Sequence, residues 1–216
     1  MTEHNFEHMR RAMVASQLRT TGVSDPRVVA AMGAVPRERF VPEDRCAIAY
    51  ADALVPLGHG RALNSPMALG RMLSEAGLRG DEHGLVIGAG TGYSAAVLGR
   101  LARSVTAVEE VPELAQFARA ALAKSGVAVV EGPLDQGHRA GAPYDFILID
   151  GAVEHVPDAI VGQLGDGGEI ALALLDEGVT RLCIGRVVGG AFGATAFADA
   201  AVAILPGFEK PRTFSF

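Results

Sequence analysis

The sequence predicts an α/β domain in which helices cover a mainly parallel sheet. Leu85–Ile87 is a short, branched apolar run of the kind that forms a buried strand. Alternating glycines and a helical pattern follow it, as in the first half of a nucleotide-binding unit. Strands and helices then alternate, which is typical of parallel strands with helices on both faces. We expect a single domain over 1–216, with a helical and substrate-loop portion at 1–80 and a cofactor-binding core at 81–216.

Composition narrows the class of protein. The chain has 216 residues, of which 49% are hydrophobic, and this suits one domain with a substantial core. The net charge is −6 and no basic run exceeds two residues, so nucleic-acid binding is disfavoured. Cys46 and Cys183 form no metal or redox motif, which favours a reducing compartment. With no signal-peptide pattern and no apolar run of about 18 residues, we expect a cytoplasmic protein without membrane contact.

The portion before the glycine turn is expected to be mainly helical. Met9, Met13 and Val14 recur at helical spacing, and Gly22 should end that helix. Asp25 followed by Pro26 is a helix-start signal. Further on we expect a turn-rich segment at 35–42, a loop at 57–66 and a helix at 67–78.

The core elements follow in order after the glycine turn. Pro112 is expected at the first helical position after the second strand, Ser104–Glu109. The remaining segments are a third strand at 127–130, a fourth at 144–149 closed by an Asp150-Gly151 turn, a short helix at 160–164 and a fifth strand at 170–175. The tail is expected to add two antiparallel strands, at 181–188 and 201–205, the latter as an internal strand.

The glycine spacing points to a particular cofactor. Gly88, Gly90 and Gly92 form G-x-G-x-G, and Tyr93 stands where dinucleotide binders have their third glycine. This form suits S-adenosylmethionine, which has no pyrophosphate to bind. Glu109 ends the second strand about 20 residues after the first glycine, where ribose hydroxyls are recognised. An ordinary solvated carboxylate is the alternative for Glu109, and the glycine turn before it favours the ribose role.

Several collinear segments resemble the protein-L-isoaspartate O-methyltransferase family. They are MVASQL (13–18), DPRVV (25–29), VPRERFVP (35–42), AYAD (49–52), GHG (58–60), GAGTGY (88–93), VE (108–109) and PEL (112–114). The resemblance spans about residues 10 to 170. It implies a Rossmann-like, seven-stranded fold that depends on S-adenosylmethionine, with an N-terminal helical cap. It also implies methyl transfer to the α-carboxylate of isoaspartyl residues in damaged proteins, and isoaspartyl-containing peptides or proteins as partners.

The chemistry that the resemblance implies needs little from side chains. A carboxylate with a pKa near 4 is already ionised at neutral pH, so the acceptor requires no general base. The remaining requirement is in-line alignment of oxygen, methyl and sulfur, which is catalysis by proximity and orientation. Binding residues are therefore expected to matter more than an acid–base pair.

The substrate loop departs from the family pattern. The family usually reads Gly-Gln-Thr-Ile-Ser-Gln-Pro where this chain has GRALNSP at 60–66. The functional Ser position is Asn64, which still donates and accepts hydrogen bonds. Ser65 either takes over the catalytic role or caps the helix that begins at Pro66, and capping is the preferred interpretation. Asn64 and Ser65 are thus the catalytic candidates, beside Gly88, Gly90, Gly92 and Glu109 for the cofactor.

Further departures keep other functions open. Val86 replaces an acid that in the family orders the glycine loop, and Pro133 replaces an acid beside the adenine. Asp150 is either acceptor-facing or part of an ordinary turn. His155 with Glu154 is read as surface solvation, His59 as fixing its loop, and no metal site is expected. The alternatives are a methyltransferase for another acceptor, a non-catalytic scaffold, and, disfavoured by Tyr93, a nicotinamide-dependent oxidoreductase. The oligomeric state is left as monomer or homodimer.

Overall fold

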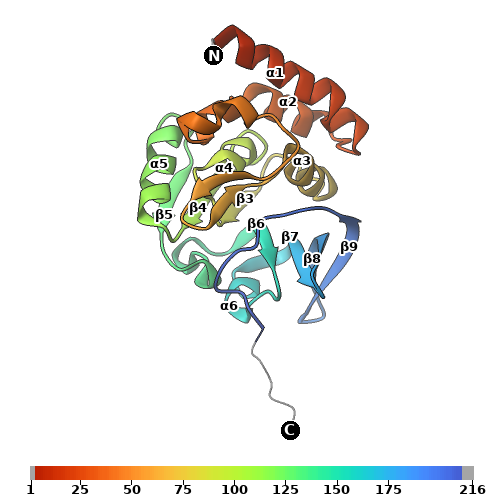
Figure 1. Ribbon diagram of the computed structural model, residues 1–216. Helices are drawn as coiled ribbons and strands as arrows, with labels where there is room; N and C mark the ends of the chain where they lie inside the picture. Colours follow the sequence, from red (N-terminus) through yellow and green to blue (C-terminus); the bar gives the residue numbers. More distant parts are fainter. Residues whose placement is uncertain (1–2, 211–216) are drawn as a thin grey trace.

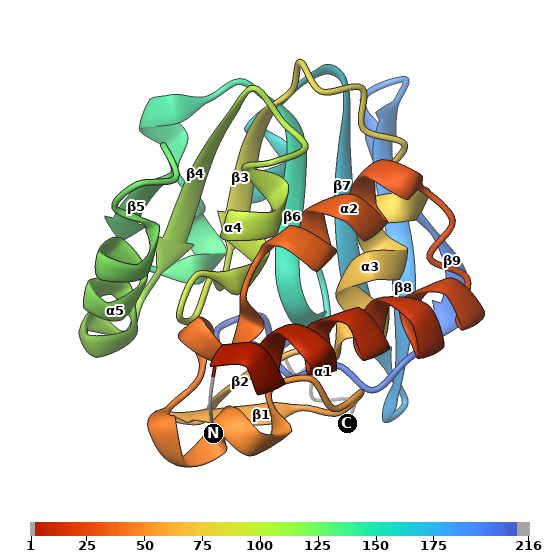
Figure 2. The same ribbon diagram turned by 90° about the horizontal axis from the view of Figure 1, so that it is seen from above.

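The computed structural model, which describes residues 3–210, contains the predicted seven-stranded sheet. The strand order is β5-β4-β3-β6-β7-β8-β9, and Figure 2 shows these strands side by side in that order. The strands run from His83 to Ile87 (β3), Ser104–Glu109 (β4), Ala128–Glu131 (β5), Tyr144–Val153 (β6), Leu164–Asp176 (β7), Val179–Val188 (β8) and Ala191–Asp199 (β9). The first five in the spatial order are parallel, whereas β8 and β9 are antiparallel additions at one edge.

Helices cover mainly one face of this sheet (Figure 1). They are α1 (Glu3–Ser16), α2 (Pro26–Ala34), α3 (Pro66–Glu75), α4 (Tyr93–Leu98), α5 (Pro112–Leu122) and α6 (Asp158–Val161), with 3-10 turns at Leu18–Thr20, Arg37–Phe40, Glu43–Ile48, Leu134–Gln136 and Arg139–Gly141. Helices α2 to α5 share one buried apolar cluster with the sheet. The second cluster contains Ile160 of α6 and the tail residues Leu205 and Phe208. None of the described helices is both long and apolar enough to cross a membrane.

Local sequence accounts for most of these elements. The side chains of Leu85, Val86 and Ile87 are fully buried, because β3 lies between parallel strands within the sheet and between the two apolar clusters on its faces. The carboxylate of Asp25 accepts a hydrogen bond from the backbone N–H of Arg27, which caps α2 as predicted. Pro112 likewise begins α5, where proline lacks only an N–H that would be unpaired in any case.

The loop predicted at 57–66 is wrong in part, because most of it forms a β-hairpin. Its strands are β1 (Val55–Gly58) and β2 (Arg61–Leu63), which pair antiparallel. His59 and Gly60 adopt positive φ angles of 52° and 71°, and this tight turn allows so short a hairpin. With only seven residues in its two strands, the hairpin carries too little alternation to predict a strand.

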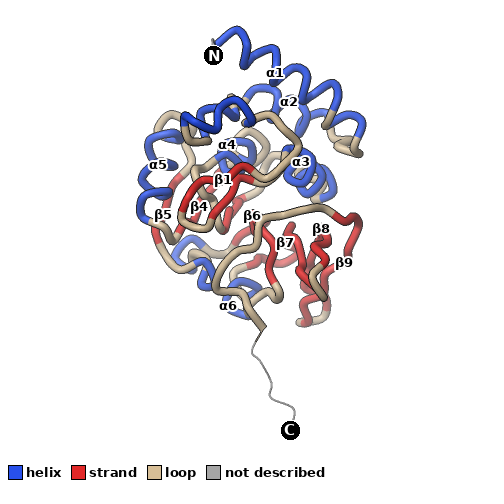
Figure 3. Tube along the Cα trace, in the orientation of Figure 1, coloured by secondary structure: helices blue, strands red, loops and turns tan. Residues whose placement is uncertain are grey.

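The internal strand predicted at 201–205 is also wrong. The last strand of the sheet is β9, which pairs antiparallel with β8. The chain then returns as a loop toward β6 (Figure 3). Residues 200–208, which we call the tail segment, make only one β-bridge, between Ile204 and Ala152. The backbone N–H of Ala152 donates to Ala203, and the N–H of Leu205 donates to Ala152, at 2.7 and 2.9 Å. The tail segment therefore runs parallel to β6 beside its carboxyl end.

Two predicted boundaries shift for the same reason. The fourth strand does not end in a turn at Asp150-Gly151 but continues to Val153, because β7 and the tail segment supply pairing partners beyond Ile149. The short helix ends at Val161 instead of Leu164, which already belongs to β7. Periodicity alone carries no information about such tertiary pairing.

Candidate functional site

The glycine turn lies where a parallel sheet places its ligands. It connects the carboxyl end of β3 to α4, and β3 has β4 on one side and β6 on the other. The chain order reverses between β3 and β6, so this is the switch point at which open α/β sheets bind ligands. Gly88, Gly90 and Gly92 have φ angles of 78°, 55° and 98°, which side chains rarely permit.

Glu109 is brought directly to this turn. Its side chain is fully buried, and one carboxylate oxygen accepts a hydrogen bond from the backbone N–H of Gly90 at 2.7 Å. The other oxygen accepts from the backbone N–H groups of Glu110 and Val111, each at 3.1 Å. The solvated-carboxylate alternative is therefore wrong. Glu109 orders the glycine turn from the end of the neighbouring strand, although Val86 replaces the acid that does so in the family.

Arg61 is the site residue that sequence reasoning missed. Its Nη1 atom donates to Glu109 at 2.8 Å, and this pair is almost completely buried. Its Nη2 atom lies over Gly88, 3.1 Å from where a Cβ would stand. The available signal was the loop itself, since Arg61 occupies the position of the family's Gln. Without knowledge of the hairpin, nothing related Arg61 to an acid 48 positions later.

Apolar side chains close over the same turn. Leu57 of the hairpin would lie 3.0 Å from a Cβ at Gly90, and Leu205 of the tail segment would lie 2.9 Å from one at Gly88. Residues 88–92 are consequently all buried. The hairpin and the tail segment together form a cover over the glycine turn.

Asn64 connects three parts of the chain. Its Nδ2 atom donates to the Asp150 carboxylate at 2.9 Å, and its Oδ1 atom accepts from the backbone N–H of Ala203 at 2.8 Å. The guanidinium of Arg37 donates to the Asn64 carbonyl. A serine hydroxyl carries one donor proton on a shorter side chain, whereas an amide donates and accepts on separate atoms. The amide at the family's Ser position is thus held rigidly between β6 and the tail segment.

Asp150 belongs to this site and not to a turn. It lies in β6 with an exposed fraction of 7%. Burial raises the pKa of its carboxyl group, and the hydrogen bond from Asn64 and the charges of Arg37 and Arg61 offset that effect only in part. An acid whose charged form is disfavoured by burial therefore lies beside Asn64.

Ser65 points the other way. Its hydroxyl oxygen accepts a hydrogen bond from the backbone N–H of Ala68 at 3.3 Å and so caps α3, directly before Pro66. The capping interpretation is confirmed, and of the two adjacent candidates only Asn64 faces Asp150.

Several buried polar atoms beneath the turn have no hydrogen-bond partner. They are Nη1 of Arg37, the hydroxyl of Tyr93 and the hydroxyl of Ser94. The Arg37 guanidinium lies over the Tyr93 ring at 4.7 Å from its centroid. Buried polar groups are normally paired, so this is the part of the described structure where a ligand or water would satisfy most donors.

The other polar candidates have structural roles. His59 lies in the hairpin turn with a positive φ of 52°. His155 bonds the carbonyl of Phe208 through Nδ1 at 3.0 Å, and Glu154 accepts from the backbone N–H of Lys210 at 2.8 Å. The surface-solvation interpretation of this pair is therefore incomplete, because both side chains anchor the tail. Among the described residues, no group of His, Cys, Asp or Glu is arranged to hold a metal ion.

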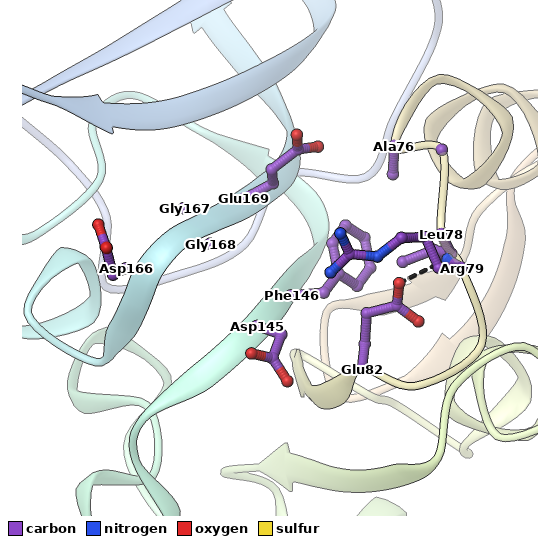
Figure 4. Close-up of a pocket in the computed structure, with 11 residues that line it drawn as sticks. Ala76, Leu78, Arg79, Glu82, Asp145, Phe146, Asp166, Gly167, Gly168 and Glu169 are labelled. Atoms are coloured by element: carbon purple, nitrogen blue, oxygen red, sulfur yellow. Dashed lines mark hydrogen bonds between the residues drawn. The ribbon is translucent and has the colours of Figure 1, made fainter.

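A separate polar cleft opens at the opposite side of the sheet, near the amino ends of the parallel strands. Figure 4 shows Glu82 and Asp145, which stand near the amino ends of β3 and β6, together with Arg79. The Glu82 carboxylate there accepts hydrogen bonds from the backbone N–H groups of Arg79 and Gly80. Because ligands bind at the carboxyl ends of parallel strands, this cleft is not the candidate site.

Comparison with known proteins gives consistent results. Residues 9–182 match the family model described as protein-L-isoaspartate(D-aspartate) O-methyltransferase. A protein-L-isoaspartate O-methyltransferase 1 from Rhodopseudomonas palustris is 41% identical over 82% of this chain and 74% of its own length. A protein-L-isoaspartate O-methyltransferase 2 from Marinobacter nauticus is 39% identical over 95% of this chain and 96% of its own length.

Two solved structures share the fold. One, described as a protein-L-isoaspartate O-methyltransferase, superposes with a TM-score of 0.80 at 23% identity, over 92% of this chain and 66% of that chain. The other comes from Plasmodium falciparum and is described as a complex with S-adenosyl-L-homocysteine. It superposes with a TM-score of 0.77 at 16% identity, over 93% of this chain and 97% of that chain.

Proposed function

The chain belongs to the protein-L-isoaspartate(D-aspartate) O-methyltransferase family, and from this premise we propose that it methylates carboxylates with S-adenosylmethionine. The acceptor is the α-carboxylate of an L-isoaspartyl residue in a damaged protein. The observation that carries the proposal is the 2.7 Å hydrogen bond between Gly90 and Glu109, which joins the two cofactor-binding features at the switch point.

The residues present fit an adenosyl cofactor. Gly88 and Gly90 have no Cβ, and Leu205, Arg61 and Leu57 lie within about 3 Å of where one would stand, so a ligand reaches this backbone once those side chains move. Glu109 ends β4 beside the turn, where its carboxylate is positioned for ribose hydroxyls. When bound, the cofactor supplies an electrophilic methyl group on a sulfonium centre.

The chain's own part in the reaction is to position the acceptor. Asn64 lies at the carboxyl end of β6 with its amide fixed by Asp150 and Ala203, so its orientation is set before the acceptor arrives. Arg37 holds the backbone of Asn64 from beneath. The acceptor carboxylate is already ionised at neutral pH, so no residue has to remove a proton.

The direct test is methyl transfer to a synthetic isoaspartyl peptide, with the ester detected by mass spectrometry. The same peptide with an ordinary aspartyl residue is the substrate control. Glu109→Gln should weaken cofactor binding by about 10–100-fold, since hydrogen bonds to charged groups contribute about 1.5–3 kcal/mol. Absence of the ester with the isoaspartyl peptide, at saturating cofactor, would contradict the proposed acceptor.

A second candidate function is favoured by one observation, the contact between Asn64 and Asp150. An acid at the acceptor position is able to take a proton from a hydroxyl or amine, which a carboxylate acceptor does not need. Transfer to such an acceptor, with none to the isoaspartyl peptide, would select this function. Absence of transfer to any acceptor would leave the scaffold alternative.

The remaining partner and location assignments are proposals of the same kind. Both cysteines are free, which supports residence in a reducing compartment such as the cytoplasm. The acidic net charge of −6 supports peptides and proteins, and not nucleic acids, as partners. Fractionation of the native cells and sedimentation of the purified protein test the location and the choice between monomer and homodimer.

A further inference from the structure

The Arg61–Glu109 pair occupies the carboxylate that the proposed cofactor requires. The two side chains are 4% and 0% exposed, and the distance between Nη1 and Oε1 is 2.8 Å. A carboxylate that is already paired with a cation has little to offer a ribose hydroxyl. A ribose hydroxyl at Oε1 of Glu109 therefore competes with Arg61 for the same oxygen.

The Arg61 side chain has a second position within reach. Gly88 follows β3, which lies between β4 and β6, so Glu109 at the end of β4 is on one side of it and Asp150 of β6 is on the other. The Nη2 atom of Arg61 lies over Gly88, in the middle of this row. Neighbouring strands are about 4.8 Å apart, so a rotation of the long side chain carries the guanidinium from Glu109 toward the acceptor side.

The guanidinium of Arg61 is held by acidic side chains, Glu109 at 2.8 Å and Glu110 at 3.9 Å. Arg37 is fully buried and is held in place by the backbone, since it donates to the carbonyls of Ala49 and Asn64, and only its Nη1 atom has no partner. A carboxylate acceptor that approaches Asn64 also approaches Asp150, and a positive charge is needed there to favour it. A guanidinium binds carboxylates in a forked geometry, which the family's Gln at this position does not offer.

We propose that Arg61 is a switch residue that pairs with Glu109 in the free protein and with the acceptor's carboxylate once the cofactor's ribose has taken Glu109. This proposal rests on the proposed function and adds an order to it. The cofactor binds first, the hairpin and the tail segment open to admit it, and Arg61 then completes the acceptor site. Cofactor and acceptor binding are therefore positively coupled, and the coupling passes through Arg61.

The test is calorimetric titration with S-adenosylhomocysteine and with an isoaspartyl peptide, each alone and in the presence of the other. For the unaltered protein we expect the peptide to bind at least about 10-fold more tightly when S-adenosylhomocysteine is present. For Arg61→Gln we expect S-adenosylhomocysteine alone to bind about 10-fold more tightly, because its competitor for Glu109 is gone. The same variant should lose the coupling and bind the peptide weakly under both conditions.

Two further variants separate this switch from general damage. Arg103→Gln removes an exposed arginine just before β4 and should leave both affinities unchanged. Arg61→Lys keeps the charge without the fork, so it should retain part of the coupling. Thermal unfolding of each variant shows whether it is folded at the temperature of the titrations.

The outcomes for the switch and for the proposed function are distinct. If the unaltered protein binds S-adenosylhomocysteine and Arg61→Gln binds it no more tightly, the switch is wrong and the cofactor assignment stands. Equal peptide affinity with and without S-adenosylhomocysteine would also overturn the switch. Binding of S-adenosylhomocysteine by neither protein would overturn both the switch and the proposed function.

Discussion

Asn64 and Ser65 show how adjacent residues come to have different roles. Asn64 follows the hairpin and faces Asp150, whereas Ser65 precedes α3 and caps its first turn. A change of one position along the chain thus separates a residue of the candidate site from a helix cap. One pair of variants tests both the site role of Asn64 and the capping role of Ser65.

Asn64→Ala should destabilise the fold by about 1–3 kcal/mol, because the Ala203 N–H and the Asp150 carboxylate each lose a buried partner. It should also abolish acceptor turnover. Ser65→Ala is the matched control and should cost only about 1 kcal/mol, the usual contribution of a helix cap, without loss of turnover. Chemical denaturation and initial rates measure the two effects. Similar rates for both variants would contradict the assignment of Asn64.

Asp150 predicts a dependence of stability on pH. Its carboxyl pKa is raised above its ordinary value of 3.8 in the folded protein, mainly by burial. Between pH 3.8 and the pKa of the folded state, the folded chain therefore keeps a proton that the unfolded chain releases. The stability that this proton contributes is complete below pH 3.8 and is lost as the pH rises through the folded-state pKa.

Asp150→Asn should therefore raise the melting temperature at neutral pH, because it removes the buried charge and keeps an oxygen to accept from Asn64. A gain of about 1 kcal/mol corresponds to about 2–4 °C for a domain of this size. The gain should shrink as the pH falls toward 3.8. Calorimetric scans at several pH values check this, and a variant that melts lower at neutral pH would show that the carboxylate stabilises the fold.

At the scale of elements, the glycine turn depends on both backbone conformation and space. Gly90→Val would impose a side chain on a φ of 55° and place its Cβ 3.0 Å from Leu57. We expect loss of S-adenosylhomocysteine binding and destabilisation by about 1–3 kcal/mol. Gly193→Ala in the edge strand β9 is the control, since a Cβ there meets nothing within 4 Å. Titration and thermal unfolding of both variants test the turn, and full affinity in Gly90→Val would contradict its role.

In the whole molecule, the hairpin and the tail segment must move to admit a ligand to the glycine turn, while the central sheet keeps its structure. The hairpin at 55–63 and the tail segment contact the glycine turn from two sides, whereas β3 and β6 are buried in the core. Hydrogen exchange should therefore change on addition of S-adenosylhomocysteine mainly in these two segments and hardly at all in β7 to β9. Unchanged exchange in the hairpin and the tail segment, at saturating ligand, would mean that the ligand binds elsewhere.

The central unit of the fold could be predicted from the amino-acid sequence. The strand at 85–87, the glycine turn, the strand Ser104–Glu109 and the starts of α2 and α5 all follow from patterns within a few residues. Buried parallel strands need continuous apolar runs, turns with positive φ need glycine, and helices need caps. Each of these requirements involves only residues close together in the chain, so the local sequence pattern predicts it.

The contacts of the site residues, in contrast, depend on how distant parts of the chain pack together. Glu109 meets an arginine 48 positions away, Asn64 meets an acid 86 positions away, and the same Asn64 holds a backbone N–H 139 positions away. Each of these contacts exists because the hairpin and the tail segment fold over the ends of neighbouring strands. No short-range pattern encodes the meeting of segments so far apart, and the closed cover and the Arg61–Glu109 pair are consequences of packing.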